Sequence, residues 1–332
     1  MKIMFVFTGG TIGSTLMGGG VIAPDAKKSY KIIEAYAQRY PTDFDYDVTE
    51  PYTELSENNT GKHIKTLCEC VKSRLCEGYD GIIVTHGTDT LQYSAAALGY
   101  ALGVESLPVC VVSANKPIED ERSNALPNLH AAVRFIKEKA GKGVFVTYRN
   151  VGDKVVSVHR GTRLVGAAAF SDNISSAFDC VYGHFDESYN FVKNPTYREA
   201  PDALPPLDTA RLGERSDGIR VIFPYPATVY PELDESVKYI LLCTYHSGTV
   251  NTRSEYVREY FDKAKRMGVK VYAAGVADGP EYQSARAFGE LGIIPIKNIS
   301  PVAAYLKLWL LSLDGKESVD KLSLSLGGDM AR

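Results

Sequence analysis

The sequence is poor in cysteine and tryptophan, and it has neither a long apolar run nor an excess of one charge. Six cysteines in 332 residues are too few for a disulfide scaffold. No apolar run approaches the roughly 20 residues that cross a bilayer, which argues against a membrane protein. The 37 basic and 40 acidic residues leave a formal charge of −3. This balance argues against a nucleic-acid partner, because such partners usually require a basic face.

The first seven residues form a short apolar run that turns polar at residues 8–10 (TGG). The run is too short for the apolar region of a signal peptide, and no cleavage pattern follows it. We therefore expect a cytoplasmic protein. Three cysteines lie close together, at Cys68, Cys70 and Cys76, but their spacing is not that of a zinc site. We expect them to act as small apolar residues.

Short apolar runs alternate with helical patterns along most of the chain. Residues 3–7 and 81–84 are β-branched or aromatic runs that predict buried strands. Between the first strand and a helix expected at residues 29–39 lies a glycine-rich loop, residues 8–28, and loops of this length are usually functional. Buried strands that alternate with helices predict an α/β fold with a parallel sheet covered on both faces. Further strands are expected at residues 108–112, 143–147, 155–158, 219–223, 239–243, 269–274 and 293–296, and further helices at residues 60–75, 91–102, 124–139, 254–267, 283–291 and 302–313.

The alternation stops between Lys193 and Asp217, where four prolines occur among polar residues. This composition predicts a linker at residues 194–217. A larger N-terminal parallel-sheet domain, residues 1–193, is then followed by a smaller α/β domain, residues 218–332. Two domains also suit the length of the chain.

Two motifs with threonine and glycine follow two of the predicted strands. Residues 8–13 are TGGTIG, and residues 85–90 are THGTDT. In parallel α/β sheets, ligands bind beyond the carboxyl ends of the strands. Glycines expose backbone N–H groups that suit an anion or a developing oxyanion. A threonine hydroxyl becomes a nucleophile when another group removes its proton. The two motifs therefore predict a site for nucleophilic chemistry.

Each motif also has a plainer interpretation. A glycine-rich turn after a first strand commonly binds phosphate or only turns the chain, although residues 8–13 lack both the GxGxxG and the GK[ST] pattern. Thr88 or Asp89 is a good N-cap for the next helix. His86 is more often a structural histidine than a general base in such a setting. The presence of both motifs at two strand ends favours the functional interpretation.

Together, the motifs resemble those of the bacterial-type L-asparaginase family, most closely its cytoplasmic type I branch. The resemblance extends to residues 55–58 (LSEN), 113–117 (SANKP) and 244–248 (TYHSG), and to the order of the two domains. It implies a hydrolase of linear amides, which converts L-asparagine or a related small amide to L-aspartate and ammonia through an acyl-threonine intermediate. It also implies a homodimer or homotetramer that uses no metal and no organic cofactor.

The resemblance gives individual residues their expected roles. Thr11 matches the nucleophile, Thr88 the second catalytic threonine, and Asp89 the aspartate that holds the substrate's amino group. Ser56 and Glu57 match positions that bind the α-carboxylate and α-amino ends of the substrate. The other implied substrate-binding positions are Gly10, Gly87, Ala114 and, from a neighbouring subunit, Asn251.

Two positions depart from the family pattern. Gly166 stands where the family has the lysine that activates the second threonine, and Val21 stands where it has a tyrosine. Tyr30 and Lys116 are candidates to replace these groups, whereas Arg163 cannot act as a base because its pKa is too high. The departures support a second hypothesis, a catalytically impaired or divergent asparaginase-like protein that binds an amino acid. A third is a nucleotide- or phosphate-binding protein that uses the glycine-rich loop.

Overall fold

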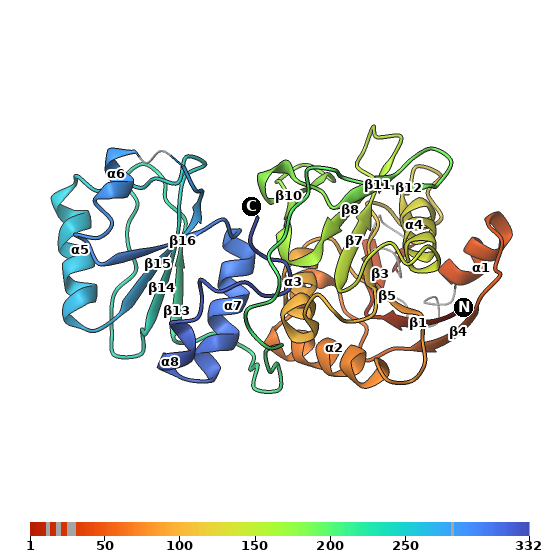
Figure 1. Cartoon of the computed structure of the whole chain (residues 1–332), viewed down its shortest axis with the longest axis horizontal. Coiled ribbons are helices and arrows are strands. Elements are labelled where there is room, and N and C mark those ends of the chain that lie inside the picture. Colours follow the sequence, from red (N-terminus) through yellow and green to blue (C-terminus); the bar gives the residue numbers. More distant parts are fainter. Residues whose placement is uncertain (11–13, 18–20, 25–30, 280–281, 332) are drawn as a thin grey trace.

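The computed structural model of the chain describes residues 1–10, 14–17, 21–24, 31–279 and 282–331 (Figure 1). Within these residues, none of the helices is long and apolar enough to cross a membrane. The helices are α1 (Lys31–Arg39), α2 (Gly61–Arg74), α3 (Leu91–Leu102), α4 (Ala125–Lys137), α5 (Glu255–Arg266), α6 (Gln283–Arg286), α7 (Pro301–Leu313) and α8 (Lys316–Val319). The strands are β1 (Lys2–Phe7), β2 (Ser14–Met17), β3 (Val21–Pro24), β4 (Asp45–Thr49), β5 (Gly81–Thr85), β6 (Val109–Val112), β7 (Val144–Tyr148), β8 (Val156–Arg160), β9 (Leu164–Ala167), β10 (Ile174–Ser176), β11 (Gly183–Phe185), β12 (Phe191–Lys193), β13 (Ile219–Ile222), β14 (Tyr239–Cys243), β15 (Lys270–Val276) and β16 (Ile293–Lys297).

The larger sheet has eight strands in the order β12-β11-β8-β7-β6-β5-β1-β4. The pairs from β4 to β7 are parallel, as the alternation of strands and helices predicts. The pairs formed by β8, β11 and β12 are antiparallel, so the expectation of a wholly parallel sheet was wrong at this edge. The reason is the connection from β7 to β8, residues 149–155, which is too short for the crossover that parallel neighbours require.

Both faces of the larger sheet are covered, which explains why its strands are almost continuously apolar. Along β1, Met4 and Val6 point into a core with α2 and α3. Phe5 and Phe7 point the other way, into a core with α1 and α4. Successive side chains of a strand alternate between faces, so one apolar run serves two cores. The site described below lies where these strands end.

The second sheet contains β13, β14, β15 and β16 in that order, and all its pairs are parallel. Helix α7 lies between the two sheets in Figure 1, and it contacts α3 of the larger one. The Tyr100 hydroxyl donates to the Ala303 carbonyl across this contact at 3.1 Å. The expected linker is packed against the protein, because Leu204, Leu207 and Leu212 are buried in the same core. We propose 1–193 and 218–332 as the two domains.

Several local expectations were too simple. The glycine-rich loop contains a hairpin, in which β2 pairs with β3. The helix expected at residues 283–291 is only the four-residue α6. Thr90, and not Thr88 or Asp89, is the N-cap of α3. The two motif residues before Thr90 therefore lie outside the helix, in the loop at the end of β5.

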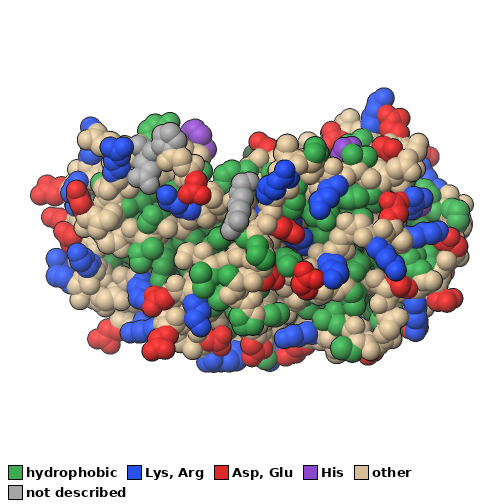
Figure 2. All heavy atoms as spheres, viewed as in Figure 1, with side chains coloured by type: hydrophobic (Ala, Val, Ile, Leu, Met, Phe, Trp, Pro, Cys, Tyr) green, Lys and Arg blue, Asp and Glu red, His purple; other side chains and the backbone are tan. Residues whose placement is uncertain are grey.

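Acidic and basic side chains intermix over the face shown in Figure 2. The exposed ion pairs include Lys62 with Glu214 at 3.0 Å and Lys142 with Glu105 at 3.0 Å. Exposed pairs of this kind each contribute little to stability. The interspersed charges agree with the near-balance of acidic and basic residues in the sequence.

Buried His159 predicts a specific loss of stability in acid. Its side chain is 2% exposed, and burial lowers its pKa from 6.5 to about 4. The folded state therefore keeps the ring neutral while the unfolded state protonates it. This contribution to stability is complete above pH 6.5 and is lost as the pH falls toward 4, by up to about 1.4 kcal/mol per pH unit.

The expected result is a shallower fall in the free energy of unfolding between pH 6.5 and 4 for His159→Gln than for the wild type. Urea titration at several pH values measures it. His246→Gln is the matched control, because His246 is exposed. An identical pH slope for His159→Gln and the wild type would contradict the prediction.

Candidate active site

The two threonine motifs start side by side because β1 and β5 are neighbours in the sheet. The buried Thr8 hydroxyl donates to the Thr85 carbonyl at 2.7 Å, which ties the two strand ends together. The Gly10 N–H donates to the Glu54 carbonyl at 3.1 Å, and the Glu54 N–H donates to the Thr8 carbonyl at 3.1 Å. The segment that leads to Ser56 is thereby joined to the same place.

Glycines allow these segments to touch. Gly10 has a φ of +76°, and a Cβ at this position would lie 2.3 Å from the Gly87 nitrogen. A Cβ on Gly87 would lie 2.5 Å from the Ser56 hydroxyl. Contacts this short are not possible for any side chain, so both positions require glycine. The structure thus brings together three of the predicted site residues, Gly10, Gly87 and Ser56.

Gly10→Ala should therefore open the site and not only strain the backbone. Gly78 is the matched control, since its φ is +80° and a Cβ there would meet nothing within 4 Å. Gly78→Ala should cost only the strain of a left-handed conformation, about 1–2 kcal/mol. Gly10→Ala should cost more and should weaken the binding of L-aspartate at least about tenfold.

Thermal unfolding and calorimetry measure the two effects. Equal stability and equal aspartate affinity in Gly10→Ala and Gly78→Ala would contradict the prediction.

Ser56 and Asp89 face each other across the site. Ser56 is buried, and its hydroxyl oxygen accepts from the Asp89 N–H at 3.2 Å and lies 3.5 Å from Asp89 Oδ2. The Thr90 hydroxyl donates to the Ser56 carbonyl at 2.8 Å. A carboxylate next to a hydroxyl and backbone N–H groups can hold the two charged ends of an amino acid. Glu57, the next residue, is exposed on the 3₁₀ turn Ser56–Asn58.

A cavity of about 250 Å³ opens between Thr88, Asp89 and the loop of residues 167–172. Residues 167–169 are all alanine, so this wall is made of small side chains. Gly166 lies next to it with a φ of +92°, and a Cβ there would be 2.8 Å from the amide carbon of Gln92. Gln92 therefore fills the space beside the position at which the family resemblance places a lysine.

The candidate replacement cations have other contacts. Lys116 lies 3.9 Å from Asp120. Arg163 is 1% exposed and donates to the carbonyl oxygens of Gly328 and Met330 at 2.7 Å each. Neither cation lines the cavity beside Thr88. Among the described residues, no group of three or more histidine, cysteine, aspartate or glutamate side chains is arranged to hold a metal ion.

Other predicted residues lie elsewhere or outside the described parts. Ala114 is buried just after β6. Asn251 lines a cavity of about 580 Å³ whose walls all come from residues 250–290 of the second domain. Thr11 and Tyr30 fall outside the described residues, and of Val21 only the backbone is described, in β3. Their roles stay predictions.

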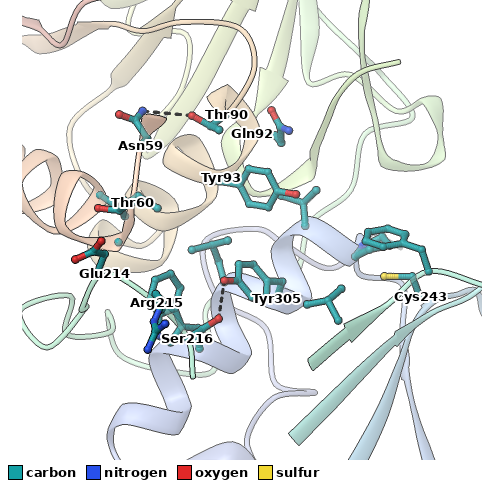
Figure 3. A pocket seen from close by; sticks show the side chains of 18 of the residues that line it. Asn59, Thr60, Thr90, Gln92, Tyr93, Glu214, Arg215, Ser216, Cys243 and Tyr305 are labelled. Carbon is teal, nitrogen blue, oxygen red and sulfur yellow. Dashed lines mark hydrogen bonds between the residues drawn. The ribbon is translucent and has the colours of Figure 1, made fainter. Parts of the chain in front are cut away.

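Sequence reasoning missed two polar residues, Asn59 and Gln92. Both line a cavity of about 690 Å³ between the two sheets, and Thr90 lies between them in Figure 3. The pattern Asn59-Thr60 predicts a helix cap, and Thr60 is indeed the N-cap of α2. The Asn59 side chain instead turns toward the second threonine motif, and no pattern in the sequence marks that contact.

The model of a known protein family, described as asparaginase, N-terminal, matches residues 2–181 of this chain. The chain belongs to the asparaginase family. Its similarity to solved asparaginases shows the same fold over nearly the whole length. An L-asparaginase from Thermococcus kodakarensis is 21% identical, with a TM-score of 0.80 and coverage of 99% of each chain. L-asparaginase I from Vibrio cholerae is 20% identical, with a TM-score of 0.76 and coverage of 99% of this chain and 98% of the other.

Relatives with curated names include one of the component chains of glutamyl-tRNA(Gln) amidotransferase. The chain of that enzyme from Pyrobaculum aerophilum is 26% identical over 97% of this chain and 78% of its own length. The one from Pyrococcus abyssi is 25% identical over 98% of this chain and 75% of its own length. The similar proteins thus include some that are named as asparaginases and some that are named as components of an amidotransferase.

Proposed function

We propose that the protein is an asparaginase-type amidohydrolase that cleaves L-asparagine or a related small amide to L-aspartate and ammonia. The observation that supports this most is the meeting of Gly10, Gly87 and Ser56, with Asp89 beside Ser56. This contact brings the loops of both threonine motifs to one point. Asp89 and Glu57 would bind the ammonium group of the substrate. Ser56 and the N–H groups near Gly87 would bind its carboxylate.

In the proposed reaction, the Thr11 hydroxyl attacks the side-chain amide carbon. The proton of that hydroxyl is transferred, with help from Thr88, to the leaving nitrogen, which departs as ammonia. Water then hydrolyses the acyl-threonine ester and releases aspartate. Ala114 would lie near the amide that is cleaved.

We also propose a cytoplasmic homodimer or homotetramer, in which Asn251 of a second copy completes the substrate site. Asn251 lies in the second domain, in a cavity apart from the threonine motifs, which supports a contribution between copies. The names of the amidotransferase relatives make a different partner chain the alternative. Light scattering of the purified protein tests this. A dimer or tetramer supports the proposal, and a monomer at micromolar concentration contradicts it.

A second candidate function is a non-catalytic protein that binds an amino acid at the same site. Gly166 favours it, because this position has no side chain to activate Thr88. Two measurements on the wild type separate the candidates. Ammonia release from asparagine or glutamine supports the hydrolase. Saturable binding of aspartate without ammonia release supports the binding protein, and absence of both overturns the two together.

A further inference from the structure

Asn59 lies between the two loops that form the candidate site, and its amide group contacts the second threonine motif at two points. The amide nitrogen, Nδ2, is 3.3 Å from His86 Nε2 and 3.3 Å from the Thr90 hydroxyl oxygen. Figure 3 shows the second contact. His86 is fully buried and directly precedes the Gly87–Thr88 peptide. None of the roles assigned above uses Asn59 or His86.

The other ring nitrogen determines where the hydrogen of His86 lies. His86 Nδ1 is 2.8 Å from the Gly87 carbonyl oxygen, which can only accept, so Nδ1 carries the hydrogen. Burial lowers the pKa of the ring below its usual 6.5, so the ring is neutral. Nε2 then has a lone pair and accepts from Asn59.

The second amide hydrogen of Asn59 has an equally definite acceptor. The Thr90 hydroxyl donates to the Ser56 carbonyl at 2.8 Å, so its oxygen is available to accept from Asn59. Both hydrogens of the amide are thus used, while Asn59 Oδ1 has no partner among the described residues. A carboxylate at this position would direct an oxygen at the lone pair of Nε2, and an apolar group would leave two polar atoms unpaired.

We propose that Asn59 and His86 are positioning residues of the candidate site, a role that rests on the function proposed above. Through Thr90, Asn59 fixes the Ser56 backbone and hence the Ser56 hydroxyl that meets Asp89. Through His86, it fixes the Gly87 carbonyl. Because the peptide is planar and trans, the Thr88 N–H then points away from His86. That N–H is one of the donors assigned to the ligand carboxylate.

Nuclear magnetic resonance of the full chain with ¹⁵N-labelled histidine tests the first step without any ligand. We expect a neutral His86 with its hydrogen on Nδ1 at pH 7. Asn59→Leu keeps the approximate shape and removes both donors, so the Nε2 resonance should shift while the hydrogen stays on Nδ1. A hydrogen on Nε2 in the wild type, or an Nε2 resonance that does not change in Asn59→Leu, would overturn the proposal.

Calorimetry with L-aspartate tests the effect on the site. Asn59→Leu should weaken binding about ten- to a hundredfold. Asn58→Leu is the control, because Asn58 is exposed and its side chain bonds Glu54 at 3.0 Å, away from the second motif. It should stay within about twofold of the wild type. Equal affinity in the two variants would overturn the proposal.

A second variant guards against loss of folding. Thr90→Val keeps the shape of Thr90 and removes one of the two contacts, so it should weaken aspartate binding less than Asn59→Leu but in the same direction. If it leaves the affinity unchanged, the path through Ser56 is wrong. If the wild type itself binds no aspartate, the proposed function fails, and the resonance measurement still decides the Asn59–His86 contact.

Discussion

Thr11→Ala should lower the rate of amide hydrolysis at least about a thousandfold while the protein stays folded. Loss of a catalytic nucleophile commonly removes most of the rate enhancement of an enzyme, because the covalent intermediate can no longer form. Ammonia release under saturating asparagine measures the effect, and circular dichroism checks the fold. Since Gly10 precedes Thr11 and contacts Gly87, the hydroxyl would be lost at the point where the two motifs meet.

Thr66→Ala provides the matched control for this change. The Thr66 hydroxyl is exposed on α2 and donates to the Lys62 carbonyl at 2.9 Å, far from any assigned role. Its turnover should equal that of the wild type. Full activity in Thr11→Ala together with loss of activity in Thr88→Ala would reverse the roles assigned to the two threonines.

Asp329→Ala should destabilise the folded protein by about 3–5 kcal/mol, the largest effect on stability that we expect. Asp329 and Lys307 are both fully buried, with Oδ2 and Nζ 2.7 Å apart. The same carboxylate accepts from the Tyr100 hydroxyl at 3.1 Å and from the Leu326 N–H at 3.1 Å. Removing it leaves the Lys307 ammonium buried with no opposite charge, and also leaves a cavity.

Asp320→Ala is the control for charge removal. Asp320 pairs with Lys270, and both side chains are substantially exposed, so the loss should be below about 1 kcal/mol. Denaturant titration gives both values. Similar losses in Asp329→Ala and Asp320→Ala would show that the buried pair has no special weight. The pair lies where α7 meets α3, so its loss would also loosen the contact between the two sheets.

Local patterns were sufficient to predict the central strands of the larger sheet. The runs at residues 3–7 and 81–84 are buried on both faces, so every position must be apolar and the signal is strong. Strand β4 (DYDVT) has an exposed, polar composition and carries no such signal. The short strands β11 and β12 were missed for a similar reason, since three residues show no period.

The candidate site could be predicted only as far as its motifs reach. Gly10 and Gly87 are marked by the sequence because a close backbone approach requires glycine. Asn59 and Gln92 are not marked, because their importance comes from tertiary neighbours that lie about 27 and 74 residues away along the chain. Gly166 is visible as a departure from a family pattern, but the side chain that fills its space is visible only in three dimensions.

The central claim is that Thr11 forms a covalent ester with its substrate at the point where the two motifs meet. The most direct test is mass spectrometry of protein that is quenched in acid during turnover of asparagine and then digested with trypsin. The peptide of interest spans residues 3–27, between Lys2 and Lys27. We predict an aspartyl ester that fragmentation locates on Thr11. An unmodified peptide in protein that releases ammonia, or an ester on another residue, would contradict the claim.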